Sequence, residues 1–348
     1  MGPPRDPLGL AATGRAGTVE RFLKPAAGYL LGAACLAWLF HDVHPREVLR
    51  TASGMNWGWV GVAICFDIAS YVSQGWRWKL LLAPLGRIGT LRATQAIYVG
   101  LFANEVLPMR AGEFARTWLV SRWLASDFSA VIPSIAVERL FDGVWLAICM
   151  GLTAIFVPLP RNLAAAADVL GVAVLLATAL FLYLVYRKRE QPPETARAAL
   201  QHWKPVRLLL SLIDALELGL RKIGLSRSFY LAFGGSLLLL AGQILAFWFV
   251  MLACGLHLSV WVGAVVLLIV HLGTMIPNAP ANLGTYQFFV VVGLGVFGVE
   301  KGAATGFSFI VFFLLTVPLW VIGLFALART GMTLTAIRRE IGVQAPRT

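Results

Sequence analysis

One stretch decides the fold: Asn104-Glu105-Val106-Leu107-Pro108-Met109-Arg110-Ala111-Gly112-Glu113-Phe114-Ala115-Arg116. It places four ionisable side chains and a proline-to-glycine break in a strongly apolar chain. An ionised side chain at membrane depth costs about 2.5–3.5 kcal/mol on insertion scales, so such groups usually face a cavity or a partner rather than lipid. We therefore expect a functional site at this stretch.

The composition around the stretch is that of a polytopic membrane protein. Of 348 residues, 59% are hydrophobic and 13% are charged, and the mean hydropathy is +0.77. The net charge of +12 comes from basic residues in short segments between apolar runs. This distribution fits contact with anionic lipids of the inner leaflet, and no nucleic-acid partner is expected. The four cysteines lie far apart in apolar runs, so neither a disulfide, a metal site nor another cofactor is predicted.

Two breaks interrupt the apolar runs. The arms 93–107 and 113–124 flank Pro108 and Gly112, and each is short for a full crossing, which favours a re-entrant hairpin entered from the cytoplasm. A second break, at residues 275–287, repeats the four-residue spacing with Pro280 and Gly284, 172 residues later. Interrupted segments at corresponding positions of two halves indicate the binding site of a transporter.

The predicted fold is an all-α polytopic membrane protein with six full transmembrane helices and two re-entrant helical hairpins, arranged as an inverted repeat. If the hairpin arms cross fully, the count rises to ten spans and both termini stay in the cytoplasm. The predicted parts are a disordered basic arm (1–25), one transmembrane domain (26–328, with halves of about 26–186 and 229–328) and a cytoplasmic tail (329–348). The linking segment 187–227 carries nine cations and is predicted to be cytoplasmic, either as an amphipathic helix on the inner leaflet or packed on the protein itself.

The first break is predicted to bind an anionic head group. A half-helix that begins after Pro108 points N–H groups and a positive dipole end into the cavity, and arginine binds phosphate through two parallel hydrogen bonds. Alternatively, Arg110 and Arg116 pair with carboxylates such as Glu113, Glu138 or Asp142 and only latch the hairpin; both could hold in different conformations. The predicted substrate-binding residues are Asn104, Arg110, Glu113, Arg116, Glu138, Arg139, Asp142, Asn278, Asn282 and Gln287, and the predicted hairpin breaks are Pro108, Gly112, Pro277, Pro280 and Gly284.

Other polar residues in apolar runs leave further alternatives open. Glu138 and Asp142 lie four residues apart on one helix face, and two such carboxylates can share a proton for coupling or form a salt-bridged core. Asp67 and His271 are isolated and are expected to be satisfied packing residues. The segment Trp76-Arg77-Trp78-Lys79 is typical of a membrane interface.

At these motifs the chain resembles a family of bacterial and archaeal membrane proteins named for the flippase-like transmembrane domain of lysylphosphatidylglycerol synthase. The resemblance covers nearly the whole chain. It rests on Arg77-Trp78 followed by paired leucines, on Asn104-x-x-Leu107-Pro108-x-Arg110-x-Gly112-Glu113-x-x-Arg116, on Glu138-Arg139-x-x-Asp142 and on Pro277-x-x-Pro280-x-x-x-Gly284.

The resemblance implies movement of lipids or lipid-linked sugars between leaflets. The synthase's catalytic domain has no counterpart in this sequence, so synthesis of a lysyl lipid is not carried over. Ala281-Asn282 stand where the family usually has glycines, and Gln287 stands where it has glutamate. Gln287 cannot titrate, so the departure puts a proton relay there in doubt, while hydrogen bonding to a head group remains expected.

We therefore expect a lipid flippase or transporter of the bacterial inner membrane rather than an enzyme, with no catalytic residue assigned. The cargo would be a phospholipid, an isoprenoid lipid or a lipid-linked glycan. Two alternatives stay open: a membrane-embedded glycosyl- or phospho-transferase that uses Glu113, Glu138 or Asp142 as a base, and a non-transporting assembly subunit. Beyond membrane lipids, the partners left open are a second copy of the chain and a lipid-synthesis enzyme.

Overall fold

The computed structural model describes residues 30–41, 52–106, 112–157, 161–186, 220–224, 226–274 and 280–331. These ranges are helices joined by short turns, and no strand occurs in them, which confirms the all-α class. The N-terminal arm, the tail, most of the basic segment 187–227 and the residues 107–111 and 275–279 at the two breaks lie outside the described residues.

The helices follow the apolar runs closely. A short helix at Leu30–Phe40 comes first, and a short turn of 3-10 helix, η2 (Pro280–Asn282), lies at the second break. The longer elements are α3 (Trp57–Leu82), α4 (Thr90–Val106), α5 (Gly112–Trp123), α6 (Phe128–Phe156), α7 (Arg161–Tyr186), α10 (Arg227–Ala253), α11 (Val260–Gly273), α12 (Thr285–Gly295) and α13 (Lys301–Ala328).

Three of the described helices, α6, α10 and α13, are long and apolar enough to cross a membrane, judged by length and composition. Four further apolar helices of the described chain are shorter: Leu30–Phe40, Asp168–Tyr183 within α7, α11 and α12. The all-helical, multi-pass membrane character is thus supported, while six spans and two re-entrant hairpins stay a prediction.

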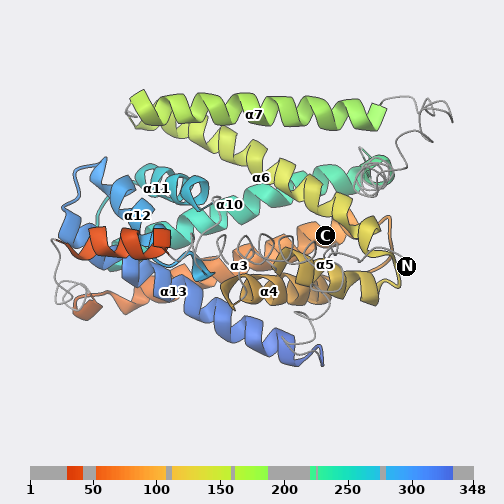
Figure 1. The fold of residues 1–348 in the computed structure, drawn as a ribbon, viewed down its shortest axis with the longest axis horizontal. Helices are drawn as coiled ribbons and strands as arrows, with labels where there is room; N and C mark the ends of the chain where they lie inside the picture. The colour runs from red at the N-terminus through yellow and green to blue at the C-terminus, as the bar shows by residue number, and fades with distance from the viewer. Residues whose placement is uncertain are drawn as a thin grey trace, which may run out of the picture.

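The helices form two sets of four, α3–α6 and α10–α13, which follow the same order (Figure 1). Each helix of the second set begins 170 to 173 residues after its counterpart in the first. The most extensive contact joins α3 to α10, the first helices of the two sets. They run antiparallel: the Asn56 amide, before α3, donates to the carbonyl of Ala253 at the end of α10 (3.0 Å). Arg77, near the end of α3, donates to Ser236 near the start of α10.

The other contacts between the sets are also reciprocal. Helix α4 packs on α13, and its counterpart α11 packs on α6, the counterpart of α13. Both pairs are antiparallel. Gln95 and Glu105 of α4 contact Ala326 and Trp320 of α13, respectively, and Phe156 at the end of α6 stacks on Trp261 at the start of α11, with ring centroids 4.4 Å apart. The described chain therefore contains the same helical arrangement twice, in opposite directions.

Two apolar cores hold these sets together. One surrounds Trp78 and Leu82 where α3 meets α4, α5 and α6, and the other surrounds Phe247 and Phe307 where α10 meets α11, α12 and α13. Leu220 and Ile223, the described end of the basic segment, are buried in the first core. For these two residues, packing on the protein is therefore the observed arrangement.

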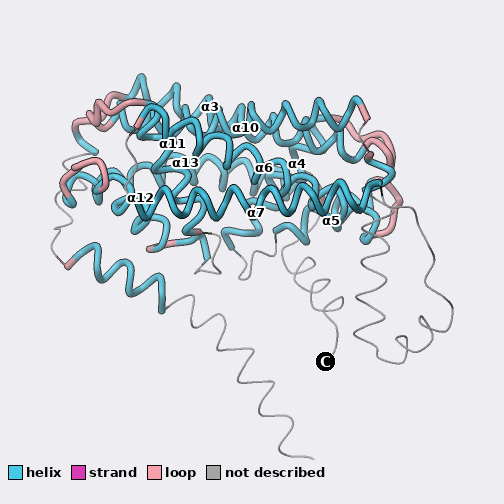
Figure 2. Tube along the Cα trace, turned by 90° about the horizontal axis from the view of Figure 1, so that it is seen from above, coloured by secondary structure: helices cyan, strands magenta, loops and turns pink. Residues whose placement is uncertain are grey.

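Helix α7 lies along the edge of the bundle and packs mainly on α6, as Figures 1 and 2 show. Most of its described apolar side chains are exposed, although Phe181 is buried in the first core. Leu175 and Leu176, for example, have 70% and 67% of their surface exposed. An apolar helix that the protein covers on one side only is suited to a lipid environment, because lipid tails are as apolar as its exposed side chains.

Candidate functional site

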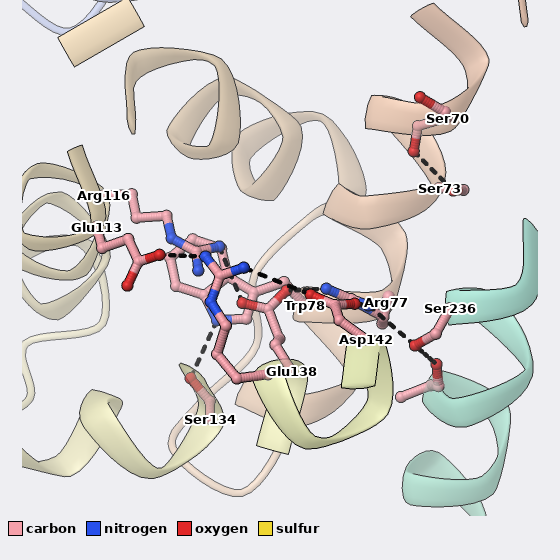
Figure 3. Close-up of polar contacts among 12 residues, drawn as sticks. Ser70, Ser73, Arg77, Trp78, Glu113, Arg116, Ser134, Glu138, Asp142 and Ser236 are labelled. Carbon is pink, nitrogen blue, oxygen red and sulfur yellow. Dashed lines mark hydrogen bonds and ion pairs between the residues drawn. The ribbon is translucent and has the colours of Figure 1, made fainter. Parts of the chain in front are cut away.

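Six ionisable side chains from α3, α5 and α6 form one connected cluster, hereafter the charge cluster (Figure 3). Helix α6 supplies three of them within five residues, on one face of the helix. Helix α3 supplies one arginine near its last turn, and α5 supplies two residues from its first turns. The members of the charge cluster are Arg77, Glu113, Arg116, Glu138, Arg139 and Asp142.

The buried end of the charge cluster is centred on Arg77, whose side chain is fully enclosed. Its guanidinium donates to Glu138 Oε1 at 2.9 Å, to the carboxylate of Asp142 and to Ser236 Oγ at 2.9 Å. Arg116 Nη1 lies 2.9 Å from Glu138 Oε2, an ion pair without hydrogen-bond geometry. A buried charge requires such pairing, because desolvation costs several kcal/mol for each ion.

Aromatic and hydroxyl groups fix this buried end. The guanidinium of Arg116 lies over the ring of Trp78, 4.7 Å from its centroid. The indole N–H of Trp78 donates to Ser134 Oγ at 3.0 Å, and Ser134 donates in turn to the carbonyl of Val131. Helices α3, α5 and α6 are thus joined by charge and by stacking at one level of the bundle.

The other end of the charge cluster is open. Arg139 pairs with Glu113, and its second nitrogen lies 3.6 Å from Asp142 Oδ2. The side chains of Arg139, Glu113 and Asp142 are 55%, 36% and 22% exposed, compared with 0% for Arg77 and 1% for Glu138. The cluster therefore runs from a dry, rigid end to an accessible end.

Three arginines and three carboxylates make the cluster neutral. Of the two alternatives for Arg116, the structure has the one in which its guanidinium pairs with a carboxylate, here Glu138, and latches the hairpin. For Glu138 and Asp142 it has the salt-bridged core, since both carboxylates hold Arg77. Arg77 itself was missed as a site residue. Its position in a Trp-Arg-Trp-Lys segment indicated a membrane interface; the structure shows that the Arg77 side chain is buried in the protein, and the interface position of the segment stays a prediction.

At the first break, α4 and α5 pack against one another through their backbones. A methyl group on Gly112 would lie 1.8 Å from the carbonyl oxygen of Gly100, so only glycine allows this approach. The amide of Gly112 donates to Asn104 Oδ1 at 2.7 Å. Asn104 therefore closes the hairpin, and Pro108 and Arg110 lie outside the described residues.

At the second break the backbone is left-handed at three positions: Ala281 (φ 59°), Asn282 (φ 52°) and Gly284 (φ 87°). The amide of Gly284 donates to Gln287 Oε1 at 2.7 Å, which caps α12. Gln287 is fully buried, and its Nε2 has no hydrogen-bond partner. Backbone strain of about 1–3 kcal/mol per residue persists only where the surroundings impose it, which marks this turn as a constrained element.

The two breaks approach one another through α4 and η2, which are in contact. Among the described residues, however, no hydrogen bond or ion pair links Asn282 or Gln287 to the charge cluster. The structure thus brings together Glu113, Arg116, Glu138, Arg139 and Asp142. Asn104 and Gln287 lie at separate hairpin closures, and Pro277 and Asn278 lie outside the described residues.

Asp67 differs from the expectation. Its side chain is 4% exposed, and it has no hydrogen-bond or ion-pair partner among the described residues. The Ser70 hydroxyl donates to the backbone carbonyl of Asp67, so this hydrogen bond does not involve the Asp67 carboxylate. The partner that the prediction for Asp67 requires is therefore not found among the described residues.

Comparison with known proteins agrees with these features. Residues 26–323 match the family model described as the lysylphosphatidylglycerol synthase TM region. A curated relative, the glycosyltransferase AglD of Haloferax volcanii, is 29% identical over 163 residues, which cover 46% of this chain and 25% of that protein. The matched part is thus only a quarter of the relative's length. Because the family model spans nearly all of the bundle, from the first helix into α13, the chain belongs to the lysylphosphatidylglycerol synthase TM-region family.

Proposed function

We propose that this protein is a lipid flippase or transporter of the inner membrane, which moves a phospholipid, an isoprenoid lipid or a lipid-linked glycan between leaflets. The observation that carries the proposal is the charge cluster: a neutral set of six ionisable groups, dry at Arg77 and accessible at Arg139, inside an apolar bundle. Membership of the lysylphosphatidylglycerol synthase TM-region family also supports a role with membrane lipids.

An anionic head group would bind at the accessible end of the charge cluster. Arg139 of α6 holds Glu113 of α5 in a half-exposed pair, and such pairs contribute only about 0–1 kcal/mol. A phosphate has oxygens that match the guanidinium as well as a carboxylate does. Head-group binding would replace Glu113 on Arg139 at little net cost and would free the first turn of α5, while Arg116 keeps α5 paired with Glu138 of α6.

The buried end supplies the fixed frame for this exchange. Breaking a buried pair costs about 3–5 kcal/mol, several times the cost at the exposed end. Arg77 and Glu138 therefore stay joined while the Arg139 pair opens. The start of α5 around Glu113 would move, while Arg116 keeps the helix joined to α3 and α6.

The repeated helical arrangement supports access from both sides. The reciprocal, antiparallel contacts of α3–α6 and α10–α13 are those of an inverted repeat, in which each half can adopt the conformation of the other. Two broken hairpins, one in each half, would then open alternately to the two membrane surfaces. The acyl chains would remain in lipid beside the apolar outer helices.

The experiment that tests the proposal is leaflet exchange in proteoliposomes, followed with a fluorescent phospholipid and a membrane-impermeant quencher. Arg139→Ala is expected to slow exchange at least about tenfold, the loss that follows from removing one charge-assisted contact of about 1.5–3 kcal/mol. Arg122→Ala is the matched control, because Arg122 lies on α5 but stacks on Trp118 outside the charge cluster. Arg110→Ala is also expected to abolish exchange. Wild-type exchange in Arg139→Ala would contradict the head-group step.

A membrane-embedded transferase is the second candidate, favoured by the likeness to a protein named a glycosyltransferase. It predicts a covalent product when the purified protein is incubated with a lipid-linked sugar donor. Mass spectrometry of the extracted lipids measures that product. A product that is lost in Glu138→Gln, without leaflet exchange in the wild type, would favour the transferase over the flippase.

A further inference from the structure

Asp67 presents a second polar feature that the charge cluster does not use. It lies in the middle of α3, ten residues before Arg77, which places it about 15 Å away along the helix. Its carboxyl group is buried and has no partner among the described residues. An isolated ionised carboxylate in such surroundings is too costly to persist, so a proton or a bound cation must neutralise it.

Tyr71 lies one turn after Asp67 on the same face of α3, and two further tyrosines come from neighbouring helices. Tyr71 of α3, Tyr98 of α4 and Tyr286 of α12 all lie within electrostatic range of Asp67. The rings of Tyr71 and Tyr98 meet edge to face, with centroids 5.6 Å apart. The Tyr98 side chain is buried, and its hydroxyl has no hydrogen-bond partner. The region thus contains a carboxylate and a hydroxyl that are both buried and that have no partner among the described residues.

The surroundings are acidic as well as polar. Glu105 of α4 lies within electrostatic range of Tyr71 and accepts a hydrogen bond from Trp320 at 3.4 Å. Neither Asp67 nor Glu105 forms an ion pair with a described lysine, arginine or histidine.

The described helices that pack on α3 have no basic side chain at the height of Asp67. The titratable residues of α10 and α13 lie near their first turns, at Arg227, Tyr230 and Lys301, and those of α6 belong to the neutral charge cluster. The described part of α4 contributes only Arg92, near its start, besides Tyr98 and Glu105. A positively charged ligand is therefore the complement that this site lacks.

We propose that Asp67, together with the Tyr71, Tyr98 and Tyr286 hydroxyls, binds a monovalent cation, either a proton or a sodium ion. Carboxylate and hydroxyl oxygens suit both. Tyr286 lies in the first turn of α12, directly after the second break, and α4 contacts η2 in that break. Occupation of the site would neutralise the carboxylate.

Binding is measured on the full-length protein in nanodiscs, without any transport step. Saturable binding of radioactive sodium and the infrared band of a protonated buried carboxyl group are the two readouts, one for each cation. The wild type is expected to show one of them, and Asp67→Asn is expected to lose it. Asp168→Asn, on the exposed face of α7, is the matched control and should keep it.

Tyr98→Phe keeps the packing and removes only the hydroxyl, so it tests the site even if Asp67→Asn does not fold. It is expected to weaken cation affinity about three- to tenfold, the effect of one hydrogen-bonding ligand. Absence of both signals from the wild type, or an unchanged signal in Tyr98→Phe and in folded Asp67→Asn, would overturn the site.

The use of this cation as a coupling ion rests on the proposed function. In proteoliposomes, an imposed proton or sodium gradient is expected to accelerate leaflet exchange in the wild type, and Asp67→Asn is expected to remove the acceleration. Exchange that occurs but ignores both gradients would overturn coupling and leave the proposed flippase intact. Absence of all exchange would contradict the flippase, while the binding measurement would still decide the site.

Discussion

The two halves of the bundle have the same helical arrangement, but charged side chains in one half correspond to apolar side chains in the other. Counting 170 residues on from Arg77 in α3 gives Phe247 in α10, and counting 173 on from Glu138 in α6 gives Val311 in α13. Phe247 and Val311 are fully buried, and Phe247 packs edge to face on Phe307 with centroids 5.4 Å apart. One half is thus joined by ion pairs and the other by apolar contacts.

This difference indicates that the charges are not needed to hold the arrangement. An apolar core of similar volume is often as stable as a buried ion pair, or more so. On the proposed function, the charges of the first half serve to bind an anion and to change partners. The second half supplies a rigid counterpart, with a strained turn at its break.

The largest expected loss of stability follows from removing the arginine at the buried end of the charge cluster. Arg77→Met should lower the free energy of unfolding by about 3–5 kcal/mol, because Glu138 and Asp142 lose the charge that compensates them. Phe247→Met, at the corresponding place, should cost about 1.5 kcal/mol or less. Unfolding followed by tryptophan fluorescence in mixed micelles measures both, and equal losses would remove the energetic distinction between the halves.

The next effect concerns the hairpin glycines. A methyl group on Gly112 would meet the Gly100 carbonyl oxygen at 1.8 Å, and one on Gly284 would meet the Gly32 carbonyl oxygen at 2.2 Å. Alanine at either position should cost at least about 1–3 kcal/mol as overpacking. Gly284→Ala should cost about 1–2 kcal/mol more, because its φ is 87°.

Gly151→Ala is the control for these glycines, because a methyl group there meets no atom within 4 Å. It should leave the protein as stable as the wild type or raise its stability by up to about 1 kcal/mol, since alanine favours the helix. Thermal unfolding in detergent compares the three variants. A Gly112→Ala protein as stable as Gly151→Ala would show that α4 and α5 need not pack this closely.

A smaller effect separates the two ways in which the breaks are closed. Asn104, before the first break, and Gln287, after the second, each accept the amide of a hairpin glycine at 2.7 Å. Asn104→Leu should cost about 1–2 kcal/mol, because it leaves the Gly112 amide without an acceptor. Gln287→Leu should cost less, since it also removes a buried Nε2 that has no partner.

Hydrogen exchange measured by mass spectrometry over each break, together with thermal unfolding, tests this pair. Each variant should raise exchange at its own break only, and the two losses should add in the double variant, because the contacts are not shared. Exchange that rises at both breaks in either single variant would show that the two closures are coupled.

The smallest effect on stability is expected at the exposed end of the charge cluster. Arg139→Ala should change the free energy of unfolding by less than about 1 kcal/mol, because the side chain is 55% exposed and its ion pair lies at the open end of the cluster. Phe312→Ala, at the corresponding buried place in α13, should cost about 3–5 kcal/mol. A loss in Arg139→Ala close to that of Arg77→Met would mean that the accessible end is structural and cannot exchange partners.

Much of the fold could be predicted because membrane helices are determined by local composition. Apolar runs and their breaks located the described helices to within a few residues, since each run must satisfy its backbone internally. The motif Glu138-Arg139-x-x-Asp142 could be assigned to one helix face from its spacing alone. Its partner Arg77 could not, because nothing in the local sequence of α3 shows which side of the helix another helix will cover.

Side-chain roles at the two breaks could be predicted only in part. Asn104 and Gln287 were expected to bind a head group, and in the structure both accept backbone amides of the hairpin glycines. An amide side chain near a broken helix suits either role, and only the position of the glycine amide distinguishes them. Asp67 shows the opposite case, since a residue expected to be satisfied has no partner in the part of the chain that the structure describes.

By itself, the sequence determined the class, the helices, the two breaks and the family, because hydropathy, proline, glycine and motif spacing act over short distances along the chain. Only the tertiary structure decided that α3 and α10 pack antiparallel, that Arg77 completes the charge cluster and that Asp67 faces three tyrosines. The physical reason is that ion pairs and buried carboxylates depend on which helix faces meet. That choice is made by packing across more than sixty residues of chain, from Arg77 to Asp142.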